Sequence, residues 1–414
     1  MASVSSSIER WWLHKILAAI GYPPIRFALN SGASIAPPGR APLATLRFHD
    51  RAALLRTILE TQIGFGEGYA QGRIDVEGDL VAALEAAYQS WPGSHADGWF
   101  ARLETCCLEH FRANTLRRSR SNVHHHYDLK PDFYERWLDR QMVYTCAYFP
   151  TPSASLEDAQ IAKMDHVCRK LQLRPGETVV EAGCGWGAFA LHMAKHYGAR
   201  VKAFNLSHEQ IVFARQQARQ QGLAGQVEFV EDDYRNITGR FDVFASIGML
   251  EHVGTRQYAE LGRVIHRTVG RAGRGLLHFI GRNSPAPLSP WITKRIFPGA
   301  YAPTLGEAMQ VLEPWDFAVW DVENLRVHYA KTLEHWLERF ERSASEISSM
   351  YDEEFVRTWR LYLAGSLVAF RVGTLQLFQV TFAAAGCELP WTRAHLYPVV
   401  QPAEQGPKWT HVMS

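Results

Sequence analysis

Between residues 178 and 247, short apolar runs alternate with longer stretches of helical periodicity. The first run ends at Val179-Val180, and three others cover Arg200–Asn205, Val227–Val230 and Phe241–Ile247. Runs of this length, rich in β-branched and aromatic residues, are typical of buried strands. Strands that alternate with helices predict a parallel, Rossmann-like sheet of the α/β class.

Three alternating glycines, Gly183, Gly185 and Gly187, follow the first predicted strand and precede a predicted helix, Ala188–Tyr197. Glycine lets the backbone turn sharply and lets a ligand approach where a Cβ atom would collide. A strand, a glycine turn and a helix form the first half of a nucleotide-binding βαβ unit. A tight connection without any ligand would give the same local pattern.

The residues after the next strands distinguish between cofactors. A dinucleotide site expects G-x-G-x-x-G and an acidic residue about 20 positions later, but here the spacing is G-x-G-x-G and the second strand ends in Asn205. After the third strand come Asp233 and Tyr234, which suit the amino group and ring face of an adenine. The pattern favours an S-adenosylmethionine (SAM) site over an NAD site.

The first 112 residues carry helical patterns and no catalytic constellation, and they predict a small, mainly helical N-terminal domain. Its helices are expected at Ile8–Ile20, Arg51–Thr61 and Asp79–Ser90, with a turn-rich segment at Gly64–Tyr69. The first helix, which contains two tryptophans, could lie on a bilayer. Packing on its own domain or on a second subunit is the interpretation we favour.

Residues 113–123 are polar and basic and predict a linker. Its clustered arginines could meet phosphates at a membrane surface or could simply be solvated. The three histidines at 124–126 lack partners at metal-binding spacing, so no metal is assigned. Residues 124–414 are expected to form the catalytic domain, with an inserted helical lid over about 285–350. Long helices are expected at Thr332–Glu346 and Glu353–Phe370, and a final strand at Leu375–Phe382.

Composition narrows the possible partners and location. The 414-residue chain has a formal net charge of +2, which implies no strong attraction to nucleic acid. Its six cysteines show no paired metal spacing and follow no secretory signal, which favours reduced thiols in the cytoplasm. No apolar run approaches the roughly 20 residues of a membrane span. We therefore expect a cytoplasmic protein that at most touches the membrane surface.

From about residue 50 to about residue 395 the chain resembles the cyclopropane-fatty-acyl-phospholipid synthase family. The motifs that carry the resemblance are, in order, His126-Tyr127-Asp128, Phe133-Tyr134, Leu138-Asp139, Tyr144-Thr145-Cys146-Ala147-Tyr148-Phe149, Glu181 to Gly187, Ser207-x-Glu209-Gln210, Asp233-Tyr234-Arg235, Gly248 to Gly254, Leu277 to Gly281, Pro290-Trp291-Ile292, Ile296 to Gly299 and Tyr329-x-x-Thr332-Leu333-x-x-Trp336. Departures from the family pattern are Lys130-Pro131 for Gly-Asn, Thr145 for Ser, Glu181 for Asp and Asn205 for Thr.

The resemblance implies a class I SAM-dependent methyltransferase that adds a methylene group to the cis double bond of unsaturated phospholipid acyl chains. Methyl transfer to the alkene leaves a carbocation, and loss of a proton from the new methyl group closes the ring. The resemblance assigns that proton to a bound bicarbonate, whose ligands correspond to Cys146, Glu251, His278, Ile280 and Tyr329. The SAM-binding residues implied are Tyr144, Thr145, Gly183, Gly185, Asn205, Ser207, Gln210, Asp233 and Tyr234.

The resemblance also implies a homodimer that associates peripherally with the inner face of the membrane. Aromatic walls for the acyl chain are expected from Phe149, Phe279, Trp291, Phe297 and Tyr301. Three other functions stay open: a fatty-acyl C-methyltransferase that leaves a methyl or methylene branch, a small-molecule N-methyltransferase, and a lipid-binding protein with an inactive SAM fold. Each site residue taken singly could also be ordinary core packing.

Overall fold

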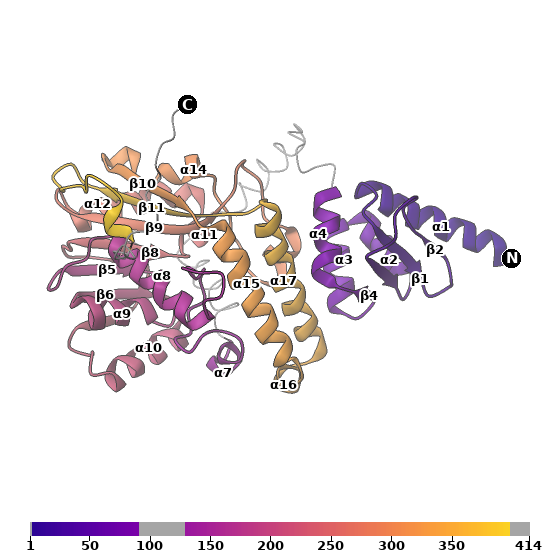
Figure 1. Ribbon diagram of the computed structural model, residues 1–414, viewed down its shortest axis with the longest axis horizontal. Coiled ribbons are helices and arrows are strands. Elements are labelled where there is room, and N and C mark those ends of the chain that lie inside the picture. The colour runs from indigo at the N-terminus through magenta and orange to yellow at the C-terminus, as the bar shows by residue number, and fades with distance from the viewer. Residues whose placement is uncertain (1, 91–128, 398–414) are drawn as a thin grey trace, which may run out of the picture.

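A computed structural model describes residues 2–90 and 129–397 of the chain (Figure 1). The predicted linker at 113–123, the histidines at 124–126 and the first motif of the resemblance, His126-Tyr127-Asp128, lie outside these ranges.

The larger part of the chain is built around a seven-stranded sheet with the strand order β10-β11-β9-β8-β5-β6-β7. Its strands are β5 (Thr178–Ala182), β6 (Arg200–Asn205), β7 (Val227–Glu231), β8 (Val243–Ile247), β9 (Arg274–Gly281), β10 (Ala318–Asn324) and β11 (Gln376–Ala383). Neighbouring strands from β7 to β9 are parallel, whereas β11 runs antiparallel to both β9 and β10. The predicted α/β class is therefore confirmed.

Both faces of the central parallel strands β5 and β8 are buried, which explains why their sequences are continuous apolar runs rather than alternating ones. Val179 packs into one core cluster, and its neighbour Val180 packs into another on the opposite face. The helices of this part are α7 (Pro131–Glu135), α8 (Leu156–Lys170), α9 (Ala188–Tyr197), α10 (His208–Gln220), α11 (Leu250–Val253), α12 (Tyr258–Val269), α13 (Pro290–Arg295), α14 (Leu305–Met309), α15 (Arg326–Arg342), α16 (Ala344–Met350) and α17 (Glu353–Val372). None of the helices in the described ranges is long and apolar enough to cross a bilayer.

The N-terminal region is mainly helical, as predicted, but it also contains a four-stranded sheet that the sequence analysis missed. Its elements are α1 (Ala2–Ala19), β1 (Ile25–Leu29), β2 (Ser34–Ile35), β3 (Ala44–Phe48), α2 (Arg51–Leu59), α3 (Thr61–Ala70), β4 (Ile74–Gly78) and α4 (Leu80–Ser90), with the strand order β2-β1-β3-β4. The equally short strands β5 and β8 are buried almost throughout and form continuous apolar runs. The N-terminal strands contain exposed or half-buried positions, so no such run marks them in the sequence.

The segment Gly64–Tyr69 lies inside helix α3 and is not a turn. Its glycines are there for packing: a Cβ atom on Gly66 would lie 2.4 Å from the Trp291 ring, and one on Gly68 would lie 2.5 Å from Ile74. Close packing against other elements has overridden the weak helix propensity of glycine.

The predicted lid boundary also needs correction, because residues 318–324 are the edge strand β10 and not part of an insertion. Helices α13 and α14 lie between β9 and β10. The pair α15 and α17 stands between the large sheet and the N-terminal region (Figure 1). Helix α17 packs on α3 and α4, and Arg357 of α17 donates to the backbone oxygen of Ile74 at 2.7 Å.

Candidate active site

A cavity opens at the carboxyl ends of the parallel strands, and the space within it and at its open mouth amounts to about 1210 Å³. Eight of the nine predicted cofactor residues line it: Tyr144, Thr145, Gly183, Gly185, Asn205, Gln210, Asp233 and Tyr234. This is the edge at which open α/β sheets bind their ligands. The structure therefore brings together residues that are widely separated in the sequence.

The glycine turn forms one wall of this cavity. Gly183 and Gly185 have φ values of 82° and 52°, a left-handed conformation that glycine adopts without a steric cost. A Cβ atom on Gly185 would meet nothing within 4 Å, whereas one on Gly187 would lie 2.7 Å from Ala214 and Phe229. Gly185 therefore keeps space open in the cavity, while Gly187 allows helix α9 to pack closely on its neighbours.

Polar side chains beyond the second strand are held in place by one another. The Asn205 amide donates to the Gln210 side-chain oxygen at 2.7 Å and to the Gly185 backbone oxygen at 3.3 Å. Ser207 is fully buried and does not line the cavity. Its hydroxyl instead caps helix α10 by accepting from the Gln210 backbone N–H, so Ser207 positions Gln210.

Asp233 lines the cavity, but its carboxylate is already engaged. One oxygen accepts from the Arg235 backbone N–H at 2.9 Å, and the two oxygens together accept from the Arg235 guanidinium. The neighbouring Asp232 also lines the cavity and was missed by the sequence analysis.

Of the five predicted anion ligands, none lines this cavity in the part of the chain that is described. Glu251 and Ile280 are directly joined, because the Ile280 backbone N–H donates to Glu251 Oε1 at 2.6 Å. His278 lies two residues earlier on β9, and its side chain therefore points to the same face as that of Ile280. Its ring contacts the Gln379 amide at 3.0 Å.

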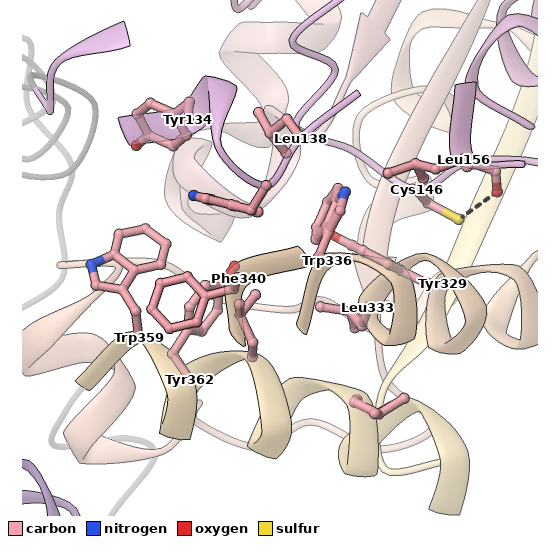
Figure 2. Packing of buried hydrophobic residues seen from close by; sticks show 14 of the residues in the cluster. Tyr134, Leu138, Cys146, Leu156, Tyr329, Leu333, Trp336, Phe340, Trp359 and Tyr362 are labelled. Carbon is pink, nitrogen blue, oxygen red and sulfur yellow. Dashed lines mark hydrogen bonds between the residues drawn. The ribbon is translucent and has the colours of Figure 1, made fainter. Parts of the chain in front are cut away.

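Cys146 and Tyr329 belong to one buried aromatic cluster, and Ile280 packs against it. Figure 2 shows Cys146 near helix α15, which carries both Tyr329 and Trp336. The Ala147 backbone N–H donates to the Thr332 hydroxyl of that helix at 3.0 Å. The five residues thus come from neighbouring elements around the ends of β8 and β9.

The protonation states in this region are set mainly by burial. Desolvation raises the pKa of Glu251 to about 7, and it holds the pKa of His278 well below its usual range. It also raises the pKa of the Cys146 thiol far above its ordinary value. Glu251 Oε2 is buried and has no hydrogen-bond partner among the described residues. A protonated carboxyl group and a neutral imidazole can each donate to an anion, whereas the Cys146 thiol already donates to the Ala147 backbone oxygen at 3.1 Å.

Comparison with known proteins identifies the family. Residues 114–380 match the model of the mycolic acid cyclopropane synthetase family. The chain belongs to this family. It is 36% identical to the cyclopropane-fatty-acyl-phospholipid synthase of Escherichia coli over 86% of this chain and 91% of that protein. It is 35% identical to a probable fatty acid methyltransferase of Pseudomonas putida, over 80% of this chain and 86% of that one.

A solved structure supports the same assignment. The mycolic acid cyclopropane synthase CmaA1, complexed with SAH and CTAB, is 30% identical with a TM-score of 0.61 and covers 64% of this chain and 98% of its own. The chain is therefore a class I SAM-dependent methyltransferase of the cyclopropane synthase family, as predicted. The cavity fits SAM, because its glycine turn leaves open space and its polar side chains converge there.

Among the departures from the family pattern, Lys130-Pro131 has a simple structural explanation. Pro131 occupies the start of helix α7, with Lys130 as the preceding cap residue. Proline is well tolerated there because its missing N–H would have no partner in the helix.

The aromatic residues predicted to surround an acyl chain do not all lie in one cluster. Phe149 and Trp291 belong to the same buried cluster as Cys146, and Phe297 packs against it. Phe279 instead lies in a cluster on the other face of the sheet, because it alternates with His278 and Ile280 along β9. The Tyr301 hydroxyl donates to Glu307.

Several other residues that line the cavity were not predicted from the sequence, notably Lys163, Met249 and His252. The signal for Lys163 was present in helix α8. Leu156, Gln160, Lys163, Val167 and Lys170 follow helical spacing and are all buried. A lysine on the buried stripe of a helix is uncommon unless it has a partner or a function.

Proposed function

We propose that this methyltransferase adds a methylene group to the cis double bond of unsaturated phospholipid acyl chains, with a bound bicarbonate as proton acceptor. The observation that carries the proposal is the buried Oε2 of Glu251, which has no hydrogen-bond partner in the described part of the chain. Glu251 lies in α11 directly before His252 and Val253, which line the cavity of the SAM-binding residues. Bound SAM supplies an electrophilic methyl group, and bicarbonate supplies an oxygen base.

The residues around Glu251 would hold the anion and would not react with the substrate. Oε1 of Glu251 is fixed by the Ile280 N–H, so the Oε2 hydroxyl of the protonated form is free to donate. Ile280 would act here by orienting Glu251, whereas the family resemblance implies that Ile280 binds the bicarbonate directly. The Cys146 thiol donates to the backbone oxygen of Ala147 at 3.1 Å. A protonated thiol is a poor nucleophile, so it would not trap a carbocation.

Apolar aromatic walls next to the cavity support a lipid substrate. His252 lines the cavity, its ring lies 5.8 Å from that of Phe297, and Phe297 lies 5.6 Å from Tyr362. These contacts connect the cavity to the large buried aromatic cluster. Such walls exclude water and can stabilise a developing cation through their ring faces.

We assign membrane contact and dimerisation to the N-terminal region, as part of the same proposal. Its first helix exposes Ile8 and Trp11, each with 53% of its surface accessible, and Lys15 lies over the Trp11 ring. A helix with exposed apolar side chains beside basic ones suits a bilayer surface.

A C-methyltransferase that leaves a methyl or methylene branch is the second candidate, favoured by the name of the Pseudomonas putida relative. Both products come from the same cation and differ only in the fate of one proton. Lipids from cells expressing the chain should be compared by mass spectrometry with lipids from cells expressing Glu251→Gln. A gain of one CH2 with loss of the alkene indicates a ring, and a gain with the alkene retained indicates a branch.

The expected result is a ring product that falls by about 10²- to 10⁴-fold in the Glu251→Gln cells, a loss typical of an impaired general base. Added bicarbonate should restore part of the rate of the purified variant if the substitution mainly weakens binding of the ion. A branched product from the wild-type chain would replace the proposed reaction by the second candidate.

A further inference from the structure

The cavity contains a buried positive charge whose role the function above leaves unexplained. Lys163 of helix α8 is 1% exposed and lines the cavity. Its ammonium group donates to Thr145 Oγ1 at 3.0 Å. Within residues 2–90 and 129–397, no carboxylate forms an ion pair with it. The buried carboxyl groups of Asp139 and Glu181 act on the ammonium electrostatically but do not pair with it. A buried ammonium without a paired counter-ion is costly, so the structure indicates that the cavity binds an anion.

The hydrogen bond to Thr145 fixes which way that hydroxyl can donate. An ammonium group has three N–H donors and no acceptor, so Thr145 Oγ1 must be the acceptor of this bond. The hydroxyl hydrogen of Thr145 is then available to another acceptor. Because Thr145 and Lys163 both line the cavity, that acceptor belongs to whatever the cavity binds.

Glu181 of strand β5 lines the same cavity and is 2% exposed, yet it does not neutralise Lys163. Its Oε2 atom has no hydrogen-bond partner in the described part of the chain. Burial raises the pKa of Glu181 to about 8 and lowers the pKa of Lys163 to about 8. Burial therefore favours the neutral forms of both Glu181 and Asp139. Neither carboxyl group forms an ion pair with Lys163, so the ammonium has no directly paired counter-ion in the described part of the chain.

Position along the sheet distinguishes the two ends of a bound SAM molecule. Glu181 lies on β5, whereas Asp233 and Tyr234 follow β7, two strands away. Neighbouring strands are about 4.8 Å apart, so these groups are separated by roughly 10 Å. The adenine suits the acidic and aromatic pair after β7. The amino-acid end would then lie near Lys163, and the like-charged sulfonium must stay farther from it.

We propose that Lys163, acting through the Thr145 hydroxyl, anchors the α-carboxylate of SAM. Lys163 is a positioning residue in this assignment, and Thr145 makes the direct contact. The inference rests on SAM being bound in this cavity and is independent of the lipid product and of bicarbonate. It also explains why a hydroxyl is retained at position 145, where the family has serine.

Removing the charge of Lys163 should reduce the preference of the protein for SAM over decarboxylated SAM. Decarboxylated SAM lacks the α-carboxylate but keeps the rest of the molecule, so the ratio of its dissociation constant to that of SAM measures recognition of the carboxylate. Calorimetric titration of the full chain should give a clear preference for SAM. In Lys163→Met the carboxylate loses a nearby positive charge and Thr145 loses the ammonium that orients its hydroxyl. Affinity for SAM should therefore fall by about 10- to 100-fold, while affinity for decarboxylated SAM should change little.

Lys170→Met is the matched control, because Lys170 is also fully buried on α8 but pairs with Glu323 at 2.7 Å, away from the cavity. That variant should keep the wild-type ratio even if it unfolds more easily. Thr145→Val should also reduce the ratio, whereas Thr145→Ser should retain it, and these two variants provide the test if Lys163→Met does not fold. Equal losses for both ligands, or no loss for either, would overturn the assignment.

Discussion

Single side chains in this protein owe their chemistry to burial more than to their neighbours. Glu251, His278 and Cys146 are all shifted toward their uncharged forms, and desolvation is the largest cause in each case. The proposed reaction would benefit from this, because neutral groups can donate hydrogen bonds to a bound anion without attacking a carbocation.

The raised pKa of Glu251 predicts a pH-dependent gain in stability for Glu251→Gln. The carboxyl titrates near 4.5 when unfolded and at about 7 when folded, so the folded state retains a proton that the unfolded state has lost. The wild type therefore loses about 3 kcal/mol of stability as pH rises from about 4.5 to about 7. The glutamine variant has no such loss, since its side-chain oxygen can still accept from Ile280.

Urea unfolding of both proteins in bicarbonate-free buffer provides the measurement. The free energy of unfolding of the two proteins should differ little at pH 5. At pH 8 the glutamine variant should be the more stable by about 2–3 kcal/mol. A variant that is less stable than the wild type at pH 8 would show that Glu251 has a stabilising partner when it is charged.

Cys146→Ser should be a mild substitution. The thiol is protonated and donates to a backbone oxygen, and a serine hydroxyl can make the same bond. We expect turnover within about tenfold of the wild type, since only one weak donor is replaced. An inactive serine variant, together with a thiol-linked acyl adduct in the wild type by mass spectrometry, would indicate covalent catalysis and exclude the bicarbonate proposal.

In the turn between β5 and α9, two glycines serve different purposes. One leaves space for a ligand, and the other allows the elements of the fold to pack closely. Gly185 borders open space, while Gly187 is enclosed by Ala214 and Phe229. The two residues have similar roles in the sequence pattern, and only their surroundings distinguish them.

Gly185→Leu should therefore weaken SAM binding at least about tenfold, because its side chain enters the cavity, and the backbone strain should cost about 1–2 kcal/mol. Gly176→Leu is the matched control. Gly176 has a φ of 85° and open surroundings, but it does not line the cavity. The Gly176→Leu variant should show the same backbone strain as Gly185→Leu and an unchanged affinity for SAM. Calorimetry and thermal unfolding measure the two effects, and equal SAM affinity in both variants would refute the assignment of the turn.

At the scale of the whole molecule, the N-terminal region is tied to the helices beside the active site. Glu67 of α3 is buried and accepts two hydrogen bonds from Arg295 of α13, at 2.7 and 2.6 Å. Trp291 of the same helix packs on Gly66. Pro298, three residues beyond Arg295, lines the SAM cavity. The two sheets are therefore connected through α13 and α17.

Gly66→Ala tests this connection, because its Cβ atom would overlap the Trp291 ring at 2.4 Å. We expect a loss of about 1–3 kcal/mol in stability from overpacking and a larger fall in turnover on phospholipid vesicles than in SAM affinity. Gly365→Ala, in helix α17 with nothing within 4 Å of the added atom, is the control and should be neutral or slightly stabilising. Unchanged vesicle turnover in a destabilised Gly66→Ala protein would show that the contact supports folding only.

The sequence by itself determined the parallel sheet, the glycine turn and eight of the residues that line the cavity. Helix Ala188–Tyr197 and strand Arg200–Asn205 have the predicted bounds, since buried parallel strands and their helices have strong local patterns. Residues at strand ends also share one edge whatever the loop details, which is why Gly183, Asn205 and Tyr234 could be grouped in advance.

Tertiary structure alone decided the features that depend on distant neighbours. The glycines of α3 looked like a turn because their contacts with Trp291 and Ile74 are not local. Strand β10 looked like part of a lid because its partner β11 is more than fifty residues away in the sequence. Ser207, predicted to bind the cofactor, instead caps helix α10. Phe279, predicted to line the acyl site, lies on the other face of the sheet from the aromatic cluster. Helical spacing places Lys163 on the buried stripe of α8, but only the tertiary structure places its ammonium in the cavity and against Thr145.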